Sequence, residues 1–147
     1  MSAKKTLLNA YRGIVQLPVQ WGDMDIGHHV NNVVYLRYLE TGRVAYLQEV
    51  GFPYMSTFEG IGPILAEIHV KYKLPVTFPD TLSVGTRVTK MDDYNLFMET
   101  VIVSEQWQKI TTTAEARIVS YDYRTKQKAH TPPDLKKKIA EWEQLTI

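Results

Sequence analysis

Apolar and polar residues alternate near the start of the chain, a pattern typical of a strand with one buried face. Within residues 12–20 the apolar positions are Val15, Leu17 and Val19, and small or polar residues separate them. Pro18 has no backbone N–H to donate, so it indicates an edge strand or a bulge. We expect this strand to be the first ordered element of the chain.

A mostly apolar segment follows, and its spacing predicts a long helix over residues 33–50. Either Asn31 or Asn32 can supply a side-chain acceptor for the first amides, and Gly51 followed by Pro53 can end the helix. Because apolar residues fall on most sides of the segment, we expect a helix that is buried on most sides. The positions that carry the pattern are Val33, Val34, Leu36, Tyr38, Leu39, Ala45, Tyr46, Leu47 and Val50.

From Gly60 the period of the pattern changes to two, which predicts a long, half-buried strand. Its buried face is expected to carry Ile64, Ala66, Ile68, Val70, Tyr72 and Leu74. Another strand begins at Leu82 and turns near Asp92 and Asp93, and two more cover residues 94–105 and 110–123. Thr131 and Pro132 resemble the N-cap and first position of a final helix, whose apolar residues Leu135, Ile139, Trp142 and Leu145 recur at helical spacing.

Five antiparallel strands can bury one long apolar helix only by curling around it. The expected fold class is therefore α+β, in the layout called a hotdog. In that layout a five-stranded antiparallel sheet wraps around one long central helix, and here a C-terminal helix is added. No repeat or second pattern interrupts this order, so we expect residues 1–147 to form a single domain.

Composition narrows the classes of function. With 147 residues, of which 44% are hydrophobic, the chain can supply one core of ordinary size. Its 17 basic and 16 acidic residues leave a net charge of +1, which gives no broad surface for nucleic acid or anionic membrane. The absence of cysteine excludes disulfides and thiolate chemistry, and no apolar run near the N-terminus is long enough for a signal peptide. We expect a soluble, cytoplasmic protein with no nucleic-acid or membrane partner.

A cluster of polar residues precedes the long helix: Asp23, Asp25, His28, His29, Asn31 and Asn32. Helix N-termini present unpaired N–H groups that attract negative charge, so this cluster is where we look for chemistry. Taken alone, an aspartate a few residues before a helix is most often a loop or capping residue. Adjacent histidines diverge on a strand or a helix, and the usual i, i+4 pair is missing, so we expect no metal site and no cofactor.

The stretch at residues 23–47, DMDIGHHVNNVVYLRYLETGRVAYL, resembles the motif of the acyl-CoA thioesterases related to 4-hydroxybenzoyl-CoA thioesterase. FPDTL at residues 78–82 is similar to that family too, as are the length and the order of elements. The resemblance implies hydrolysis of an acyl-CoA thioester to free acid and CoA, with Asp25 as general base or nucleophile. It also implies that backbone amides at the start of the central helix, in the turn from Val30 to Asn32 and chiefly those of Asn31 and Asn32, hold the carbonyl oxygen as negative charge develops there.

Other residues of the motif are implied to support these groups or to contact the substrate: Asp23, His28, His29, Val30 and Tyr35. Tyr35, Tyr38 and Tyr46 lie at helical spacing, which the core of the helix explains better than a substrate shelf does. Many relatives have glycine just before the histidine of the motif, whereas this chain has His28 there and glycine one step earlier. The turn is therefore expected to differ in shape. Some relatives have histidine at the position of Asn32, so an imidazole there is not required.

The resemblance further implies a homodimer or homotetramer with sheets joined edge to edge and active sites between subunits. The acyl donor is CoA or an acyl carrier protein, and the candidate contacts for CoA phosphates are Lys71, Lys73, Arg87, Lys90 and Arg117. Two other classes stay open: a hotdog hydratase and a non-catalytic acyl-CoA-binding protein. A hydratase would have a histidine five residues after its aspartate, but His29 lies four after Asp25. A regulatory binder would usually add a DNA-binding module, for which this chain has no room.

Overall fold

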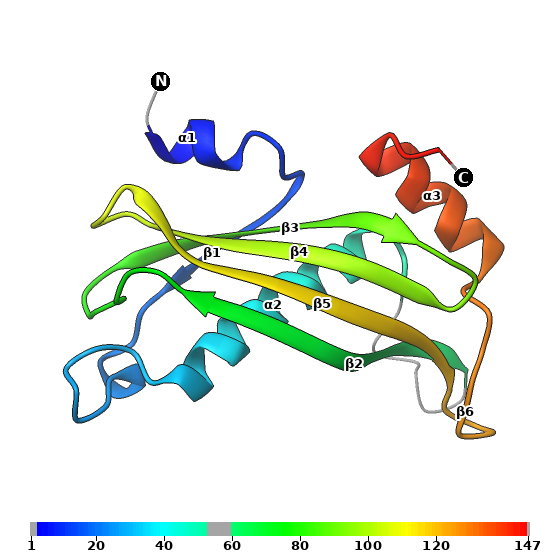
Figure 1. Ribbon diagram of the computed structural model, residues 1–147, viewed down its shortest axis with the longest axis horizontal. Helices are drawn as coiled ribbons and strands as arrows, with labels where there is room; N and C mark the ends of the chain where they lie inside the picture. Colours follow the sequence, from blue (N-terminus) through cyan, green and yellow to red (C-terminus); the bar gives the residue numbers. More distant parts are fainter. Residues whose placement is uncertain (1–2, 53–59, 147) are drawn as a thin grey trace.

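The computed structural model describes residues 3–52 and 60–146, and its centre is a curved antiparallel sheet that wraps around one long helix (Figure 1). The sheet is six-stranded, with five long strands in the order β1-β3-β4-β5-β2 and the short β6 paired with β5. The strands are β1 (Gly13–Pro18), β2 (Ile61–Tyr72), β3 (Thr81–Met91), β4 (Asn95–Ser104), β5 (Lys109–Asp122) and β6 (Gln127–Lys128). This arrangement confirms the predicted α+β hotdog fold.

The central helix α2 (Asn32–Glu49) begins where the sequence indicates. The Oδ1 atom of Asn31 accepts a hydrogen bond from the Val33 amide at 2.9 Å, so Asn31 is the N-cap. The helix ends at Glu49 with Val50 as its C-cap, and Gly51 follows with φ of +93°, a conformation that glycine adopts readily. Pro53, the other predicted stop signal, lies outside the described residues.

One face of α2 packs against the concave side of the sheet, and the close approach depends on a missing side chain. A Cβ atom at Gly42 would lie 2.6 Å from Cγ1 of Val84 on β3, so only glycine lets the helix reach this depth. Tyr38, Leu39, Tyr46 and Leu47 are buried on this face. The other face is exposed, including Val33 at 65% and Leu36 at 40%. The prediction of a helix buried on most sides was therefore wrong for this structure.

The two ends of the chain add helices around the sheet (Figure 1). Before β1 lies α1 (Ala3–Leu8), so the prediction that a strand is the first ordered element was wrong. Its Leu8 and the following Tyr11 are buried with Val101 and Val103 of β4. A single turn and a half of helix carries too few residues to show a period in the sequence.

At the other end, α3 (Pro133–Glu143) packs Leu135 and Ile139 into the core cluster that contains Tyr46 and Leu47 of α2. Its N-cap is Pro132 and not Thr131 as predicted, so the helix begins one residue later. The hydroxyl of Thr131 instead lies 2.7 Å from that of Ser120, buried beside β5. None of the helices in the described part of the chain is long and apolar enough to cross a membrane.

The edge strand β2 departs most from its predicted pattern. Its pairing with β5 shifts register between Leu65 and Glu67, which is a bulge, and the bulge resets which side chains face inward. Ile68 and Val70 contact the core as predicted, but Ile64 is 39% exposed and Tyr72 is 49% exposed. The β1 strand lies at the opposite edge of the five-strand order, which confirms the edge position predicted from Pro18.

Candidate active site

A cavity of about 470 Å³ opens between the start of α2 and the end of β2. One wall consists of the loop that enters α2 and of the first turn and a half of that helix. The opposite wall consists of the last residue of β2 and the segment that follows it. The lining residues are Asp25, His29, Val30, Asn31, Asn32 and Tyr35 on the first wall and Tyr72, Lys73, Leu74 and Pro75 on the second. Six of the eight residues predicted from the motif therefore meet in one place.

Asp25 sits in a short loop that its own hydrogen bonds close. Its amide donates to the carbonyl of His29 at 3.0 Å, and its carbonyl accepts from the amide of His28 at 3.1 Å. Its Oδ1 atom accepts from the amide of Gly27 at 2.8 Å. Its Oδ2 atom accepts no hydrogen bond from the part of the chain that the structure describes. One carboxylate oxygen thus orients the side chain and leaves the other for a ligand or water.

The backbone amides at the start of α2 are not equivalent. The amide of Val30 donates to the Val76 carbonyl at 2.8 Å, and the amide of Asn31 donates to the Asp23 carbonyl at 3.0 Å. Asn32 is the first residue of α2, and its amide has no acceptor among residues 3–52 and 60–146. Within the described residues the N–H of Asn31 is therefore already used, and the Asn32 amide is the free donor at the helix start.

The free amide of Asn32 lies at the positive end of the helix dipole. The helix α2 has 18 residues, and its aligned peptide dipoles place about half a positive elementary charge at its N-terminus. Asn32 is exposed, and it lines the same cavity as Asp25. A bound carbonyl group can thus have its oxygen at the helix start, where developing negative charge is stabilised. The Asp25 carboxylate can act at the carbon atom of the same carbonyl group.

Asp23 lies outside the lining of the cavity and ties the loop to the helix. Its Oδ2 atom accepts a hydrogen bond from the Tyr38 hydroxyl at 2.6 Å and another from the amide of Gln20 at 2.9 Å. Two effects raise the pKa of Tyr38 above its usual range: burial, which is the larger, and the hydrogen bond to this carboxylate. These contacts hold the loop against α2 and direct the Asp23 carboxylate away from the cavity lining.

The two histidines of the motif have different positions. His28 is exposed, lies outside the cavity lining, and has φ of +63°, in the left-handed region that favours glycine. His28 therefore adopts a backbone conformation that glycine adopts more readily. His29 lines the cavity, and its Nδ1 atom lies 3.2 Å from the carbonyl oxygen of Val30.

Tyr35 serves both the core and the cavity. It is only 4% exposed, its ring packs edge-on against Tyr72 with centroids 5.0 Å apart, and its hydroxyl oxygen accepts from the Val76 amide at 3.0 Å. Burial raises the pKa of Tyr35, so its hydroxyl stays protonated at neutral pH. The prediction that the tyrosines of α2 belong to the core is confirmed for Tyr35, Tyr38 and Tyr46.

Of the wall at residues 72–75, the sequence identified only Lys73, as a candidate phosphate contact. The place of this wall opposite the start of α2 comes from tertiary contacts such as the Tyr72 ring against Tyr35, although the break at Pro75 signals the end of a strand. Lys73 is the cation of this wall. Two other candidate phosphate contacts are engaged elsewhere: Arg87 pairs with Glu99 at 3.0 Å and Arg117 pairs with Glu67 at 2.8 Å.

A second cavity, of about 510 Å³, lies over strands β2 to β5 and is lined by charged side chains such as Glu67, Glu115 and Arg117. Its lining residues all come from strands, so neither the motif nor any of the described helices contributes to it. Within the described residues, no three His, Asp or Glu side chains come together in a way that could hold a metal ion. The chemistry of the motif is therefore concentrated in the cavity of Asp25.

Solved structures show the same fold. A thioesterase from Thermus thermophilus, solved with coenzyme A and Zn, superimposes with a TM-score of 0.82 at 22% identity, covering 94% of this chain and 98% of that one. A DHNA-CoA thioesterase from Staphylococcus aureus gives a TM-score of 0.81 at 19% identity, covering 90% of this chain and 91% of that one.

Sequence comparison agrees with the fold. The long-chain acyl-CoA thioesterase FadM of Escherichia coli (strain K12) is 23% identical over 124 residues, which are 84% of this chain and 94% of that protein. Residues 19–139 match the sequence model of a family described as the thioesterase-like superfamily. Because this match spans most of the chain and includes the loop, the central helix and every strand except β1, the protein belongs to the thioesterase-like superfamily.

Proposed function

We propose that this protein hydrolyses an acyl-CoA thioester to the free acid and CoA. The observation that carries the proposal is that the Asp25 carboxylate and the free amide of Asn32 line one cavity at a helix N-terminus. Membership of the thioesterase-like superfamily supports thioester chemistry, and the name of the relative FadM supports CoA as the acyl donor.

The Asn32 amide is the proposed oxyanion donor. As a nucleophile adds to the thioester carbonyl, negative charge builds on the carbonyl oxygen, and a fixed N–H at the end of a helix dipole stabilises it without reorganising. The Asn31 side chain supports this amide indirectly, because it caps the same helix through the Val33 amide. The Asn32 side chain has no required part in this step.

Asp25 supplies the nucleophile in one of two ways. As general base, it takes a proton from water while the water oxygen bonds to the carbonyl carbon. As nucleophile, its carboxylate bonds to that carbon and forms a mixed anhydride, which water then hydrolyses. In both routes the carbon–sulfur bond breaks and CoA leaves as a thiolate. Because thiols have a pKa of about 8.5, this leaving group needs little help from a general acid.

Lys73 is the proposed contact for the phosphates of CoA. It lies on the cavity wall opposite Asp25, where its ammonium group can reach an anion at the mouth. The narrow pantetheine arm can then occupy the space between the two walls while the nucleotide stays at the surface. An acyl carrier protein would present the same pantetheine arm, so it is the alternative acyl donor.

We also propose that the protein works as a homodimer or homotetramer, with β2 edges joined and active sites between subunits. Three apolar side chains of β2 support this: Ile61 is 37% exposed, Ile64 is 39% exposed and Leu65 is 43% exposed. An exposed apolar edge strand is a template for pairing with another strand. Tyr72, which ends β2, also lines the cavity, so an edge-to-edge partner would lie close to the site.

Thiol release tests the proposed function most simply. The wild type should release CoA from at least one member of a panel of short, long and aromatic acyl-CoAs. Asp25→Asn should lower kcat by about a hundredfold or more, because it removes the base or nucleophile and leaves the fold intact. Asp23→Asn is the matched control and should lose much less, since Asp23 contacts Tyr38 and Gln20 outside the cavity.

Three results would count against the proposal. Asp25→Asn with nearly full kcat, or equal losses in the two variants, would show that the roles of Asp25 and Asp23 are wrong. Acyl-CoA binding without any thiol release would favour a binding protein. Release from an acyl carrier protein only would leave the chemistry in place and change the donor.

A further inference from the structure

Residues 73–75 of the cavity wall and the adjoining Val76 belong to no helix or strand, since β2 ends at Tyr72 and β3 begins at Thr81. The position of this segment therefore depends on individual hydrogen bonds. At its start, the amides of Lys73 and Leu74 both donate to the carbonyl of Thr111, at 2.8 and 3.1 Å. These bonds hold the first two residues of the wall to β5.

Further along the segment, Val76 forms hydrogen bonds with the helix and the loop of the opposite wall. The amide of Val76 donates to the Tyr35 hydroxyl at 3.0 Å, and the carbonyl of Val76 accepts from the Val30 amide at 2.8 Å. Val30 ends the loop that carries Asp25, and the next residues start α2. A shift of the Pro75–Val76 peptide would therefore move both the Asp25 loop and the hydroxyl of Tyr35.

One side chain from outside the site holds that peptide. The indole Nε1 of Trp107 donates to the carbonyl oxygen of Pro75 at 2.8 Å. Trp107 lies in the turn between β4 and β5 and is 40% exposed, so it is not a core residue. The ring is partly covered, and the bond to Pro75 is the contact that fixes the direction of its N–H group.

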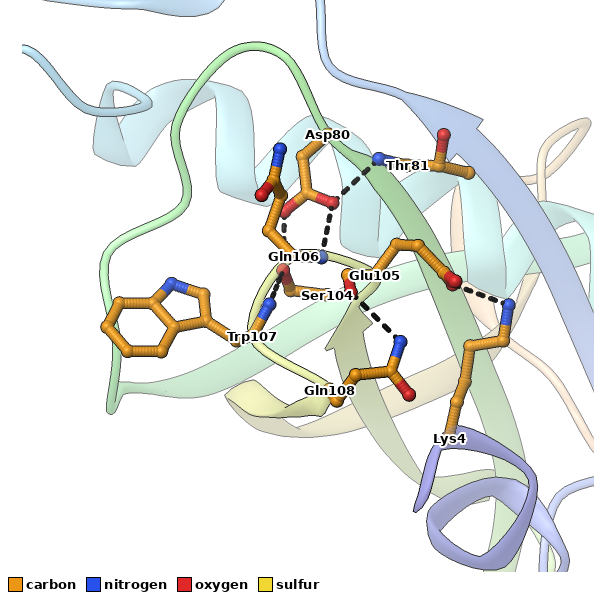
Figure 2. Close-up of polar contacts among 8 residues, drawn as sticks. All are labelled: Lys4, Asp80, Thr81, Ser104, Glu105, Gln106, Trp107 and Gln108. Atoms are coloured by element: carbon orange, nitrogen blue, oxygen red, sulfur yellow. Dashed lines mark hydrogen bonds and ion pairs between the residues drawn. The ribbon is translucent and has the colours of Figure 1, made fainter. Parts of the chain in front are cut away.

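The turn that carries Trp107 is itself held by a network of hydrogen bonds (Figure 2). The Ser104 hydroxyl accepts a hydrogen bond from the Trp107 amide at 3.0 Å and donates to the carboxylate of Asp80. The same carboxylate accepts from the amides of Thr81 at 2.8 Å and Gln106 at 3.1 Å. The aspartate of the FPDTL segment thus fixes the turn, and the turn presents the indole to Pro75.

We propose that Trp107 is a positioning residue for the thioester site: its indole N–H holds the Pro75–Val76 wall against the Asp25 loop and Tyr35. The proposal rests on the function proposed above, since the site it positions is the thioester site. Trp107 touches neither Asp25 nor Asn32, and it acts through the wall alone. Loss of its N–H loosens the wall while the ring still covers the turn.

The test compares two variants of the same turn. Trp107→Phe keeps an aromatic ring and removes the N–H that reaches Pro75 at the cavity end of the segment. Gln106→Met is the matched control, because it removes a side-chain hydrogen bond of 2.8 Å from the same turn to the carbonyl of Pro79, at the far end of the segment. Two readouts are measured: thiol release, and hydrogen exchange of single amides followed by NMR.

In Trp107→Phe, exchange of the Val30 and Val76 amides should accelerate about three- to tenfold, the effect of one lost hydrogen bond, and kcat/KM should fall by a similar factor. The Val19 amide, which donates to the Asp80 carbonyl at 2.9 Å, should exchange as in the wild type. The thermal midpoint should fall by only a few degrees, as expected for one lost hydrogen bond. Gln106→Met should leave kcat/KM and the exchange of Val30 and Val76 unchanged.

Unchanged exchange of Val30 and Val76 in Trp107→Phe would overturn the proposal. Equal effects of the two variants, with a common drop in the thermal midpoint, would also overturn it, because the turn would then act only through general stability. If the wild type releases no thiol, the proposed hydrolysis fails, and the exchange rates alone decide whether Trp107 holds the wall.

Discussion

His28 occupies the most unusual backbone conformation in the Asp25 loop, with φ of +63°. The neighbouring hydrogen bonds require this conformation, because the His28 amide donates to the Asp25 carbonyl and the Asp25 amide donates to the His29 carbonyl. A non-glycine residue in the left-handed region carries a steric cost of about 1–2 kcal/mol. Holding the Asp25 carboxylate in place therefore lowers the stability of the loop.

Substitutions at His28 should separate backbone conformation from side-chain chemistry. His28→Gly should be neutral or slightly stabilising, with kcat unchanged, because His28 lies outside the cavity lining. His28→Val should cost about 1–2 kcal/mol, since a β-branched residue strongly avoids this region. Urea unfolding and thiol release on both variants are the measurements. A valine variant as stable as the wild type would contradict the account of this turn.

At the residue scale the sequence identified most of the site. Asp25, Asn32 and Tyr35 could be named because the motif resembles a known one, and Asn31 because capping residues have a chemical signature. Which of the amides of Val30, Asn31 and Asn32 stays free could not be predicted from the sequence. The acceptors of the other two are the carbonyls of Asp23 and Val76, and the Val76 carbonyl is brought near only by the tertiary fold.

Among the elements, α3 is attached to the core by one carboxylate as well as by apolar contacts. The Oε2 atom of Glu143 accepts from the Tyr46 hydroxyl at 2.6 Å and from the Val88 amide at 2.8 Å. Val88 lies where the register of β3 and β4 shifts, so its amide takes this carboxylate as acceptor. Two effects raise the pKa of Tyr46 well above its usual range: burial, which is the larger, and the hydrogen bond to Glu143.

Removing that carboxylate should loosen α3. Glu143→Ala leaves two partly or fully buried donors without an acceptor, and we expect a loss of about 1–3 kcal/mol in the free energy of unfolding. Glu141→Ala, an exposed position on the same helix, should change it by less than about 0.5 kcal/mol. Chemical denaturation of both variants measures the difference. Equal stability of the two would show that apolar packing alone attaches α3.

Elements with many periodic residues were predicted well and short ones were not. The long helix and the five long strands carry enough alternating or helical positions to identify them, and their order selects the fold. The six residues of α1 and the two of β6 carry too few positions for any period. The bulge between Leu65 and Glu67 also breaks the alternation of β2, because sequence alone does not reveal where a register shifts.

For the whole molecule, the exposed edge at β2 is the main feature that a single chain leaves unexplained. Ile61, Ile64 and Leu65 are each more than a third exposed along a strand with one free edge. Light scattering should therefore give at least a dimer. Leu65→Lys should shift the protein toward monomer and lower activity in parallel, whereas Lys71→Glu should not shift it. An active wild-type monomer would contradict edge-to-edge assembly.

The central claim is that a backbone N–H at Asn32, and not its side chain, stabilises the oxyanion. Asn32 is the first residue of α2, the helical position at which proline is most readily accepted. Asn31 has ψ of 141°, a conformation that suits a residue before proline. Asn32→Pro therefore removes the donor and preserves the helix, and Asn32→Ala removes only the side chain.

The decisive measurement is thiol release by Asn32→Ala and Asn32→Pro, with circular dichroism to verify that α2 survives in both. We expect Asn32→Ala to keep kcat within a few-fold of the wild type. Asn32→Pro should lose about a hundredfold or more, the typical effect of removing one oxyanion donor. A folded proline variant with nearly full kcat, or an alanine variant as inactive as the proline variant, would contradict the account.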